Sequence, residues 1–330
     1  MTMTPVSRLS TLYGAGHRRL VPVLMGLMLV VPGTATGCPI PVFQYALEHW
    51  QADPYLIEVS HSGELSEDQQ AALQMLEKAA TAGTQPANLV LEQRQVQVTG
   101  EASERLPLME VRYPSLSGIR RTVWSGPLNL DNAAQLLDSP IRQEIASHLI
   151  DRRSAVWVLL ESGDRRKDRR AVEVLERELP RLENTLRVPD PGEEWGMDAG
   201  EIITDVTFHW LRLRRDDPAE QMLIRMLLET EGDLHDYAEE PMVFPVYGRG
   251  LVMYALIGEG INGWTLREAG EFVIGPCSCQ IKASNPGVDL LVSRDWNAEI
   301  VALSRYEPPA PAGTAGFLDR MDTAGERLRD

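Results

Sequence analysis

Residues 155–160 read Ala-Val-Trp-Val-Leu-Leu, an unbroken apolar run that is followed by Ser162-Gly163. An apolar run of this length without polar alternation is typical of a strand buried on both faces. A helix is predicted next, because four apolar residues recur at helical spacing: Val172, Leu175, Leu179 and Leu182. Pro180 is expected to kink or split that helix. Alternation at 206–213 predicts a second strand, so the stretch predicts a strand–helix–strand unit of an α/β fold.

The residues that follow extend this unit. Asp217-Pro218-Ala219-Glu220 predicts a helix start, because Asp caps, Pro fits the first turn and Glu closes a capping box. Two stretches, 242–247 and 251–256, flank Gly248-Arg249-Gly250, which predicts a β-hairpin. Thr265 and Glu268 predict the cap of a final helix.

The segment upstream of residue 151 repeats this order of elements. Its predicted elements are a strand at 55–60, a helix from Ser66 with Ser66 and Gln69 as a capping box, strands at 89–98 and 108–113, a short extended piece at 122–124 and a helical region at 129–150. Both halves therefore read strand–helix–strand, then a hairpin, which an extra helix precedes in the second half, and then a helix. This order predicts an internal duplication.

This order resembles the thioredoxin-like fold, in which a βαβ unit is followed by an antiparallel hairpin and a final helix. Pro107 and Pro241 are near the position at which that fold has its cis-proline. The resemblance covers most of residues 55–275. It implies two tandem thioredoxin-like α/β domains, at 38–150 and 151–300, after a cleaved signal segment.

Thioredoxin chemistry needs a Cys-x-x-Cys just after the first strand, where a helix N-terminus lowers the pKa of a thiol. The matching positions here read Ser60-His61-Ser62-Gly63 and Glu161-Ser162-Gly163-Asp164. Neither holds a cysteine, so we expect a binding role, with His61 as a polar residue at the first corner.

The first 37 residues have the composition of a secretory signal. They contain no acidic residue, carry Arg18-Arg19 before an apolar run at 21–31, and end in Ala35-Thr36-Gly37 before Cys38. That run is about 11 residues long, whereas a bilayer-spanning helix needs about 20. We therefore expect 1–37 to be a cleaved signal peptide and the mature chain to begin near Cys38, outside the cytoplasm.

Ala-Thr-Gly-Cys also resembles the lipobox of bacterial lipoproteins, in which the Cys is lipidated and becomes the N-terminus. Lipoboxes usually carry Leu where this chain has Ala35. Lipidation of Cys38 and simple cleavage both stay open, and a lipid anchor is the only membrane link that we expect. Segments 38–50, 159–163 and 275–279 look like a family of uncharacterised secreted bacterial proteins, which implies an envelope location and no particular activity.

Charge and composition narrow the partners. The net charge of −16 becomes −19 when residues 1–37, with three arginines and no acids, are removed. A surface this acidic repels nucleic acid and anionic lipid headgroups, so neither is an expected partner. Residues 301–330 include the Pro/Ala/Gly-rich stretch 307–313 and are expected to form a flexible tail. Val42, Tyr45, Ala46 and Trp50 share a helical stripe that is expected to dock onto the first domain, with a helix that faces a partner as the alternative.

Cys277-Ser278-Cys279 is the sharpest chemical candidate in the sequence. Two thiols one residue apart can form a labile disulfide or hold a soft ion such as Cu(I). A structural role in a loop, or a bridge from one of them to Cys38, is the alternative.

Gly258 to Gly263 matches G-x-G-x-x-G, but the preceding strand belongs to a hairpin, so a flexible turn is the preferred interpretation. The chain lacks H-E-x-x-H, G-x-S-x-G, a P-loop and C-x-x-C. We expect no cofactor and no metal. The sequence thus predicts a binding or assembly protein of the envelope with a protein partner, and the alternative is an oxidoreductase or copper-handling protein that uses Cys277 and Cys279.

Overall fold

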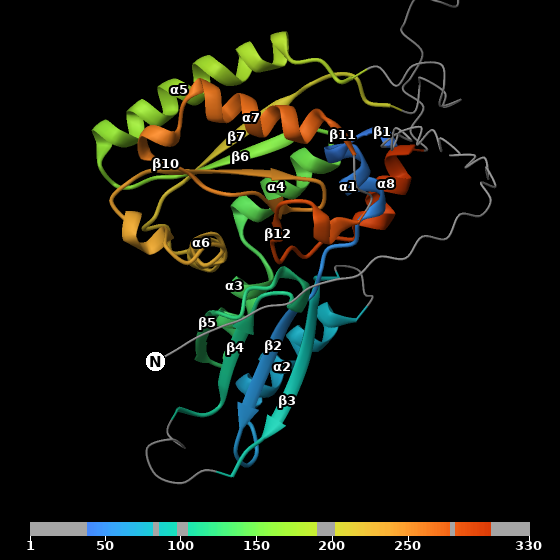
Figure 1. Cartoon of the computed structure of the whole chain (residues 1–330). Coiled ribbons are helices and arrows are strands. Elements are labelled where there is room, and N and C mark those ends of the chain that lie inside the picture. Colours follow the sequence, from blue (N-terminus) through green and yellow to red (C-terminus); the bar gives the residue numbers. More distant parts are fainter. Residues whose placement is uncertain (1–37, 82–85, 98–104, 190–201, 278–280, 305–330) are drawn as a thin grey trace, which may run out of the picture. The chain divides into compact units, whose positions relative to one another are not determined.

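The computed structural model describes residues 38–81, 86–97, 105–189, 202–277 and 281–304. Their helices and strands form a mixed α/β fold with two main sheets (Figure 1), which confirms the predicted α/β class. The expected signal peptide at 1–37 lies outside the described residues, as does most of the tail expected at 301–330. Residues 301–304 of that expected tail are instead the end of a helix, Trp296–Ser304.

The strands are β1 (Cys38–Pro41), β2 (Tyr55–His61), β3 (Leu89–Gln95), β4 (Leu108–Arg112), β5 (Thr122–Pro127), β6 (Ala155–Leu160), β7 (Phe208–Leu213), β8 (Met242–Tyr247), β9 (Leu251–Val252), β10 (Leu256–Ile257), β11 (Pro276–Cys277) and β12 (Val288–Asp289). The α-helices are α1 (Val42–His49), α2 (Glu67–Ala80), α3 (Leu130–Leu137), α4 (Pro140–Ile150), α5 (Arg165–Thr185), α6 (Gln221–Leu228), α7 (Gly263–Ile274) and α8 (Trp296–Ser304).

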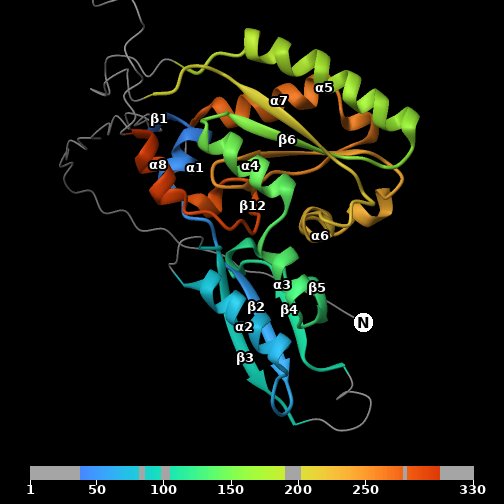
Figure 2. The same ribbon diagram turned by 180° about the vertical axis from the view of Figure 1, so that it is seen from behind.

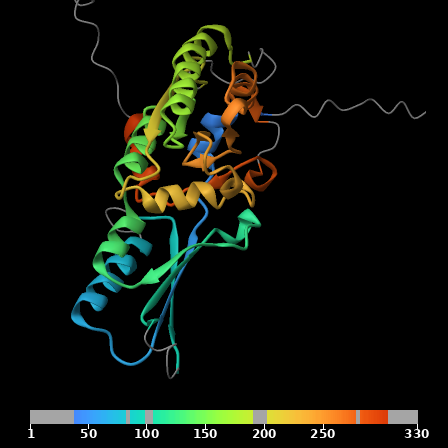
Figure 3. The same ribbon diagram turned by 90° about the vertical axis from the view of Figure 1, so that its left-hand side faces the viewer.

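The smaller sheet has the strand order β3-β2-β4-β5. Its central strand β2 runs parallel to β3 and antiparallel to β4, and β4 and β5 form an antiparallel pair. Tyr55, Ile57 and Val59 alternate along β2 and are fully buried in a cluster with residues of α2 and α3. These helices pack on one face of the sheet (Figure 3). Because successive side chains of a strand point to opposite faces, every second residue of β2 lies on this buried face.

The larger sheet has the order β12-β9-β8-β6-β7, with β10 also paired to β8. Strand β6 runs parallel to β7 and antiparallel to β8. Ala155, Trp157 and Leu159 pack with residues of α1, α5 and α7, whereas the alternate residues of β6 pack with α4 and α6. Helices therefore cover both faces (Figures 1 and 2), which is why all six residues of β6 are apolar and buried.

Buried polar contacts join the halves of the chain. The Tyr55 hydroxyl donates to the Asp289 carbonyl at 2.7 Å, and the Tyr113 hydroxyl donates to the Met226 carbonyl. The fully buried Arg142 guanidinium donates to the carbonyls of Leu136 and Leu291 at 2.8 and 2.9 Å. One hydrophobic cluster also contains residues of both sheets.

Several local predictions can be compared with the structure. The Ser66–Gln69 capping box is confirmed at the start of α2. The helical region 129–150 is two helices, because Pro140 disfavours helical backbone at the residue before it. Helix α5 runs through Pro180 without ending, so the predicted split is wrong.

Two predicted helix starts are wrong. Helix α6 begins at Gln221 rather than at Asp217, because the Glu220 carboxylate accepts the Ile141 N–H at 2.8 Å instead of closing a capping box. Helix α7 is capped by Asn262, whose side chain accepts the N–H groups of Trp264 and Thr265.

Helix α1 packs against the second half of the chain, which corrects the expectation that it docks onto the first. The Arg249 guanidinium donates to the carbonyls of Leu47 and Glu48 at the end of α1, at 2.7 and 3.2 Å. Gly248 approaches Ala46 so closely that a Cβ at residue 248 would lie 2.6 Å from the Ala46 Cβ. The β8–β9 hairpin therefore forms part of the docking site of α1, together with α7.

The prolines before the two predicted hairpins differ. The Leu106–Pro107 peptide bond is cis, and it is the only cis bond within the described ranges. The bond before Pro241 is therefore trans.

Candidate functional site

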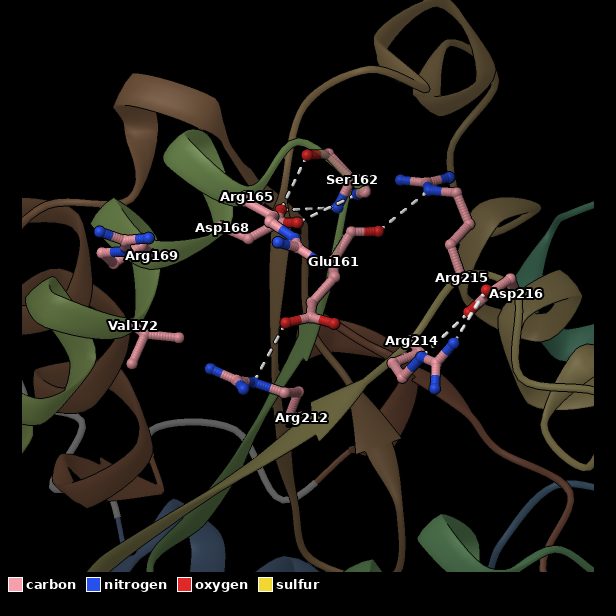
Figure 4. A pocket seen from close by; sticks show the side chains of 11 residues that line it. Glu161, Ser162, Arg165, Asp168, Arg169, Val172, Arg212, Arg214, Arg215 and Asp216 are labelled. Carbon is pink, nitrogen blue, oxygen red and sulfur yellow. Dashed lines mark hydrogen bonds and ion pairs between the residues drawn. The ribbon is translucent and has the colours of Figure 1, made fainter.

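A pocket lies where β6 and β7 end and α5 begins (Figure 4). Parallel strands bring their carboxyl ends to the same edge of a sheet, and such edges are common binding positions in α/β proteins. The cavity has a volume of about 890 Å³. Five arginines line it, namely Arg165, Arg169, Arg212, Arg214 and Arg215. We call this site the arginine pocket.

Two carboxylates at the start of α5, those of Asp164 and Asp168, accept hydrogen bonds from the backbone N–H groups near the pocket. Asp168, which is buried, accepts the Ser162 N–H at 2.8 Å, the Ser162 hydroxyl at 2.7 Å and the Gly163 N–H at 3.0 Å. Asp164 caps α5 by accepting the N–H groups of Arg166 and Lys167 at 2.8 and 3.2 Å. Because these N–H groups already have partners, the groups left to contact a ligand are the arginine side chains.

Glu161 is the pocket's central acidic group. Its Oε1 lies 3.1 Å from Nε of Arg212, and its carbonyl accepts from Nε of Arg215 at 3.1 Å. Burial raises the pKa of Glu161, and the positive charge of Arg212 opposes that rise. In Figure 4 the arginines of α5 lie on one side of Glu161, and Arg214 and Arg215 lie on the other.

The arginines differ in how far they are already paired. Arg214 forms a two-point ion pair with Asp216, at 3.1 and 2.9 Å, and this contact raises the pKa of Arg214. Burial lowers the pKa of Arg215. The side chains of Arg165 and Arg169 are exposed and make no ion pair or hydrogen bond within the described part of the chain. Those two are the pocket's uncommitted cations.

The two segments that the sequence aligned with the thioredoxin Cys-x-x-Cys position, 60–63 and 161–164, lie at the ends of β2 and β6. Glu161, Ser162 and Gly163 line the arginine pocket, and Asp164 beside them caps α5. His61 ends β2, where its Nδ1 is 3.1 Å from the Gly63 carbonyl in an exposed turn. The sequence did not single out the arginines, although Arg-Arg-Lys at 165–167 follows one predicted strand and Arg-x-Arg-Arg at 212–215 begins at the end of the other.

Cys277 does not line the arginine pocket. Cys277 is in β11 with a side chain that is 0% exposed, and Cys279 lies outside the described residues. The backbone of Cys38 pairs with that of Cys277 in the β1–β11 ladder. A thiol that is fully buried in this strand is not placed to exchange disulfides with a substrate.

The glycine-rich segment 258–263 is a 3₁₀ turn followed by the first residue of α7. The preceding strand β10 is antiparallel to β8, so no parallel βαβ unit is present at this segment. Asn262 already caps the helix N–H groups that a dinucleotide phosphate would need. The geometry is that of a turn, as expected.

Among the described residues, no helix is long and apolar enough to cross a bilayer. The same residues contain no group of three or more His, Cys, Asp or Glu side chains arranged to hold a metal ion. No family model, curated protein or solved structure matches this chain.

Proposed function

We propose that this chain is an extracytoplasmic binding or assembly protein of the cell envelope, with the arginine pocket as its binding site. The observation that supports the proposal most is the group of arginine side chains around the pocket at the end of β6. The edge at Glu161 to Asp164 has no thiol, but it borders a cavity of about 890 Å³ lined by arginines. A cavity of this size is within the range of ligand-binding sites.

We propose further that each sheet with its helices is a thioredoxin-like domain. The orders β3-β2-β4-β5 and β7-β6-β8-β9 support this, because both begin with a parallel pair and continue with an antiparallel hairpin. In such a domain the arginine pocket occupies the corner that a thioredoxin uses for its thiols. A binding surface would then have replaced a redox centre at the same place.

The alternative function, thiol–disulfide exchange or copper handling by Cys277 and Cys279, has less support. A redox or Cu(I) site must be reachable by its substrate, whereas the Cys277 side chain is fully buried. The binding function predicts no catalysis of insulin disulfide reduction by the full chain. Turnover that is lost in a Cys277→Ser/Cys279→Ser variant would favour the alternative.

A photo-crosslinking residue at position 169 tests the binding function directly. We expect a discrete adduct in envelope preparations from cells that express the full chain. The matched position is 166, which is on the same helix but does not line the pocket. Equal labelling from both positions, or none from 169, would contradict a binding site in the pocket.

The location and the N-terminal modification belong to the same proposal. We propose that the signal segment is removed and that the mature protein stays in the envelope, with Cys38 either lipidated or free. Mass spectrometry of the mature N-terminus distinguishes these forms. Recovery of the intact chain from Met1 in the cytoplasm would contradict export.

A further inference from the structure

We propose that the group bound in the arginine pocket is a multivalent oxyanion, a ligand that presents two or more phosphate or carboxylate groups. This inference rests on the proposed function, because it names the chemistry of the ligand at that site. Five arginines line the pocket against three carboxylates, those of Glu161, Asp168 and Asp216. The pocket is thus locally positive in a chain whose net charge is −16.

The position of these cations on α5 is unfavourable for the helix alone. Residues 165–170 read Arg-Arg-Lys-Asp-Arg-Arg, in the first two turns of α5. Lys167 and Arg170 pair with Glu240 and Glu259, which leaves Arg165 and Arg169 as the cations of this run that line the pocket without an acidic partner among the described residues. The N-terminus of a helix carries a partial positive charge, and a cation there costs about 0.3–1 kcal/mol. Residues that oppose local stability in this way are expected mainly at functional sites. An anion in the pocket would offset this repulsion.

The geometry also selects the kind of contact. Asp164 and Asp168 already occupy the backbone donors, so a ligand must be held by guanidinium groups. Guanidinium donors match the oxygen pairs of carboxylates and phosphates. Arg165 and Arg169 have no side-chain partner among the described residues, so a ligand can contact them without breaking an ion pair.

The size of the cavity favours a ligand with several anionic groups. The pocket has about 890 Å³, which is within the range of sites that hold ligands larger than a single small ion. Its arginines come from two segments, with Arg165 and Arg169 on α5 and Arg212, Arg214 and Arg215 at the end of β7. A ligand with two or more oxyanion groups can contact both segments at once.

Calorimetric titration of the full chain with pyrophosphate and with citrate tests the inference, with sodium chloride at matched ionic strength as the reference. We expect saturable binding of at least one probe, and the stronger probe indicates whether phosphate or carboxylate is preferred. The Arg165→Ala/Arg169→Ala variant should weaken that binding by about tenfold or more. The Arg166→Ala/Arg170→Ala variant removes the same charge from the same helix outside the pocket, and it should change binding by less than about twofold.

Equal losses in the two variants, or no saturable binding of either probe, would overturn the inference. Circular dichroism confirms that each variant is folded, and crosslinking separates the two proposals. If position 169 still gives its adduct and neither probe competes with it, the binding function stands and the oxyanion chemistry is wrong. If position 169 gives no adduct, the binding function itself is wrong.

Discussion

Glu161 Oε1 lies 3.1 Å from Nε of Arg212, so the arginine pocket contains its own counter-ion. A ligand anion that approaches Arg212 must compete with this carboxylate. Burial raises the pKa of Glu161, which brings its protonation closer to the pH range in which proteins work. The pair thus links anion binding to the charge on one residue.

Glu161→Gln should strengthen anion binding by about three- to tenfold, because removal of the carboxylate releases Arg212. As pH falls and Glu161 gains a proton, the affinity of the wild type should approach that of Glu161→Gln; because pyrophosphate protonates equally in both titrations, the ratio of the two affinities isolates the effect of Glu161. Calorimetry with pyrophosphate at several pH values measures both effects. The control is Glu173→Gln, which removes an exposed carboxylate of α5 outside the pocket. An equal gain in that control would show that only net charge matters.

Arg142→Ala should lower the free energy of unfolding by about 3–5 kcal/mol. The Arg142 guanidinium is fully buried and donates to the carbonyls of Gln135, Leu136 and Leu291, which the substitution leaves unsatisfied. Urea denaturation measures the loss. The control, Arg120→Ala, changes an exposed arginine and should lower the free energy of unfolding by less than about 0.5 kcal/mol. Similar values for the two variants would contradict a joining role for Arg142.

Gly248→Ala should destabilise the docking of α1. Gly248 has a φ of +60° and its Cβ would lie 2.6 Å from that of Ala46, so backbone strain and overlap add to about 2–4 kcal/mol. Gly63→Ala is the matched control, because its φ is +74° but no atom lies within 4 Å of the added Cβ. The control should lose only about 1 kcal/mol. Thermal unfolding of the two variants compares them, and equal losses would mean that the contact with Ala46 contributes nothing.

Asp289 should make stability depend on pH. Burial raises its pKa to about 6 from 3.8, and Lys282 opposes the rise. Because the folded-state pKa lies above the unfolded value, this contribution is fully present below pH 3.8 and is lost as pH rises through about 6. Between pH 4 and 7 the wild type should therefore lose up to about 3 kcal/mol relative to Asp289→Asn. Urea denaturation of the wild type and the variant at these pH values measures the difference in their free energies of unfolding. A difference that does not change with pH would contradict the raised pKa.

The α/β class could be predicted because all six residues of β6 are apolar, which indicates a strand that is covered on both faces. The Ser66–Gln69 box was equally local, since both residues act within one turn of helix. The start of α6 was not predictable, because Glu220 bonds to the distant Ile141 instead of to its own helix. The docking of α1 depends on the long-range contacts of Arg249.

The arginine pocket was missed for the same reason. Arg165 and Arg212 are 47 positions apart in the sequence, and only the parallel pairing of β6 and β7 brings their segments to one edge. Each basic run alone is compatible with a solvated surface. A prediction of the pocket needs the strand order as well as the sequence motifs.

The most direct test of the account is a titration of the isotope-labelled full chain with pyrophosphate, followed by amide chemical shifts. The account predicts saturable shifts concentrated at 161–170 and 212–216, the two segments that line the arginine pocket. Shifts centred on 275–277, or shifts that scale only with ionic strength, would contradict it.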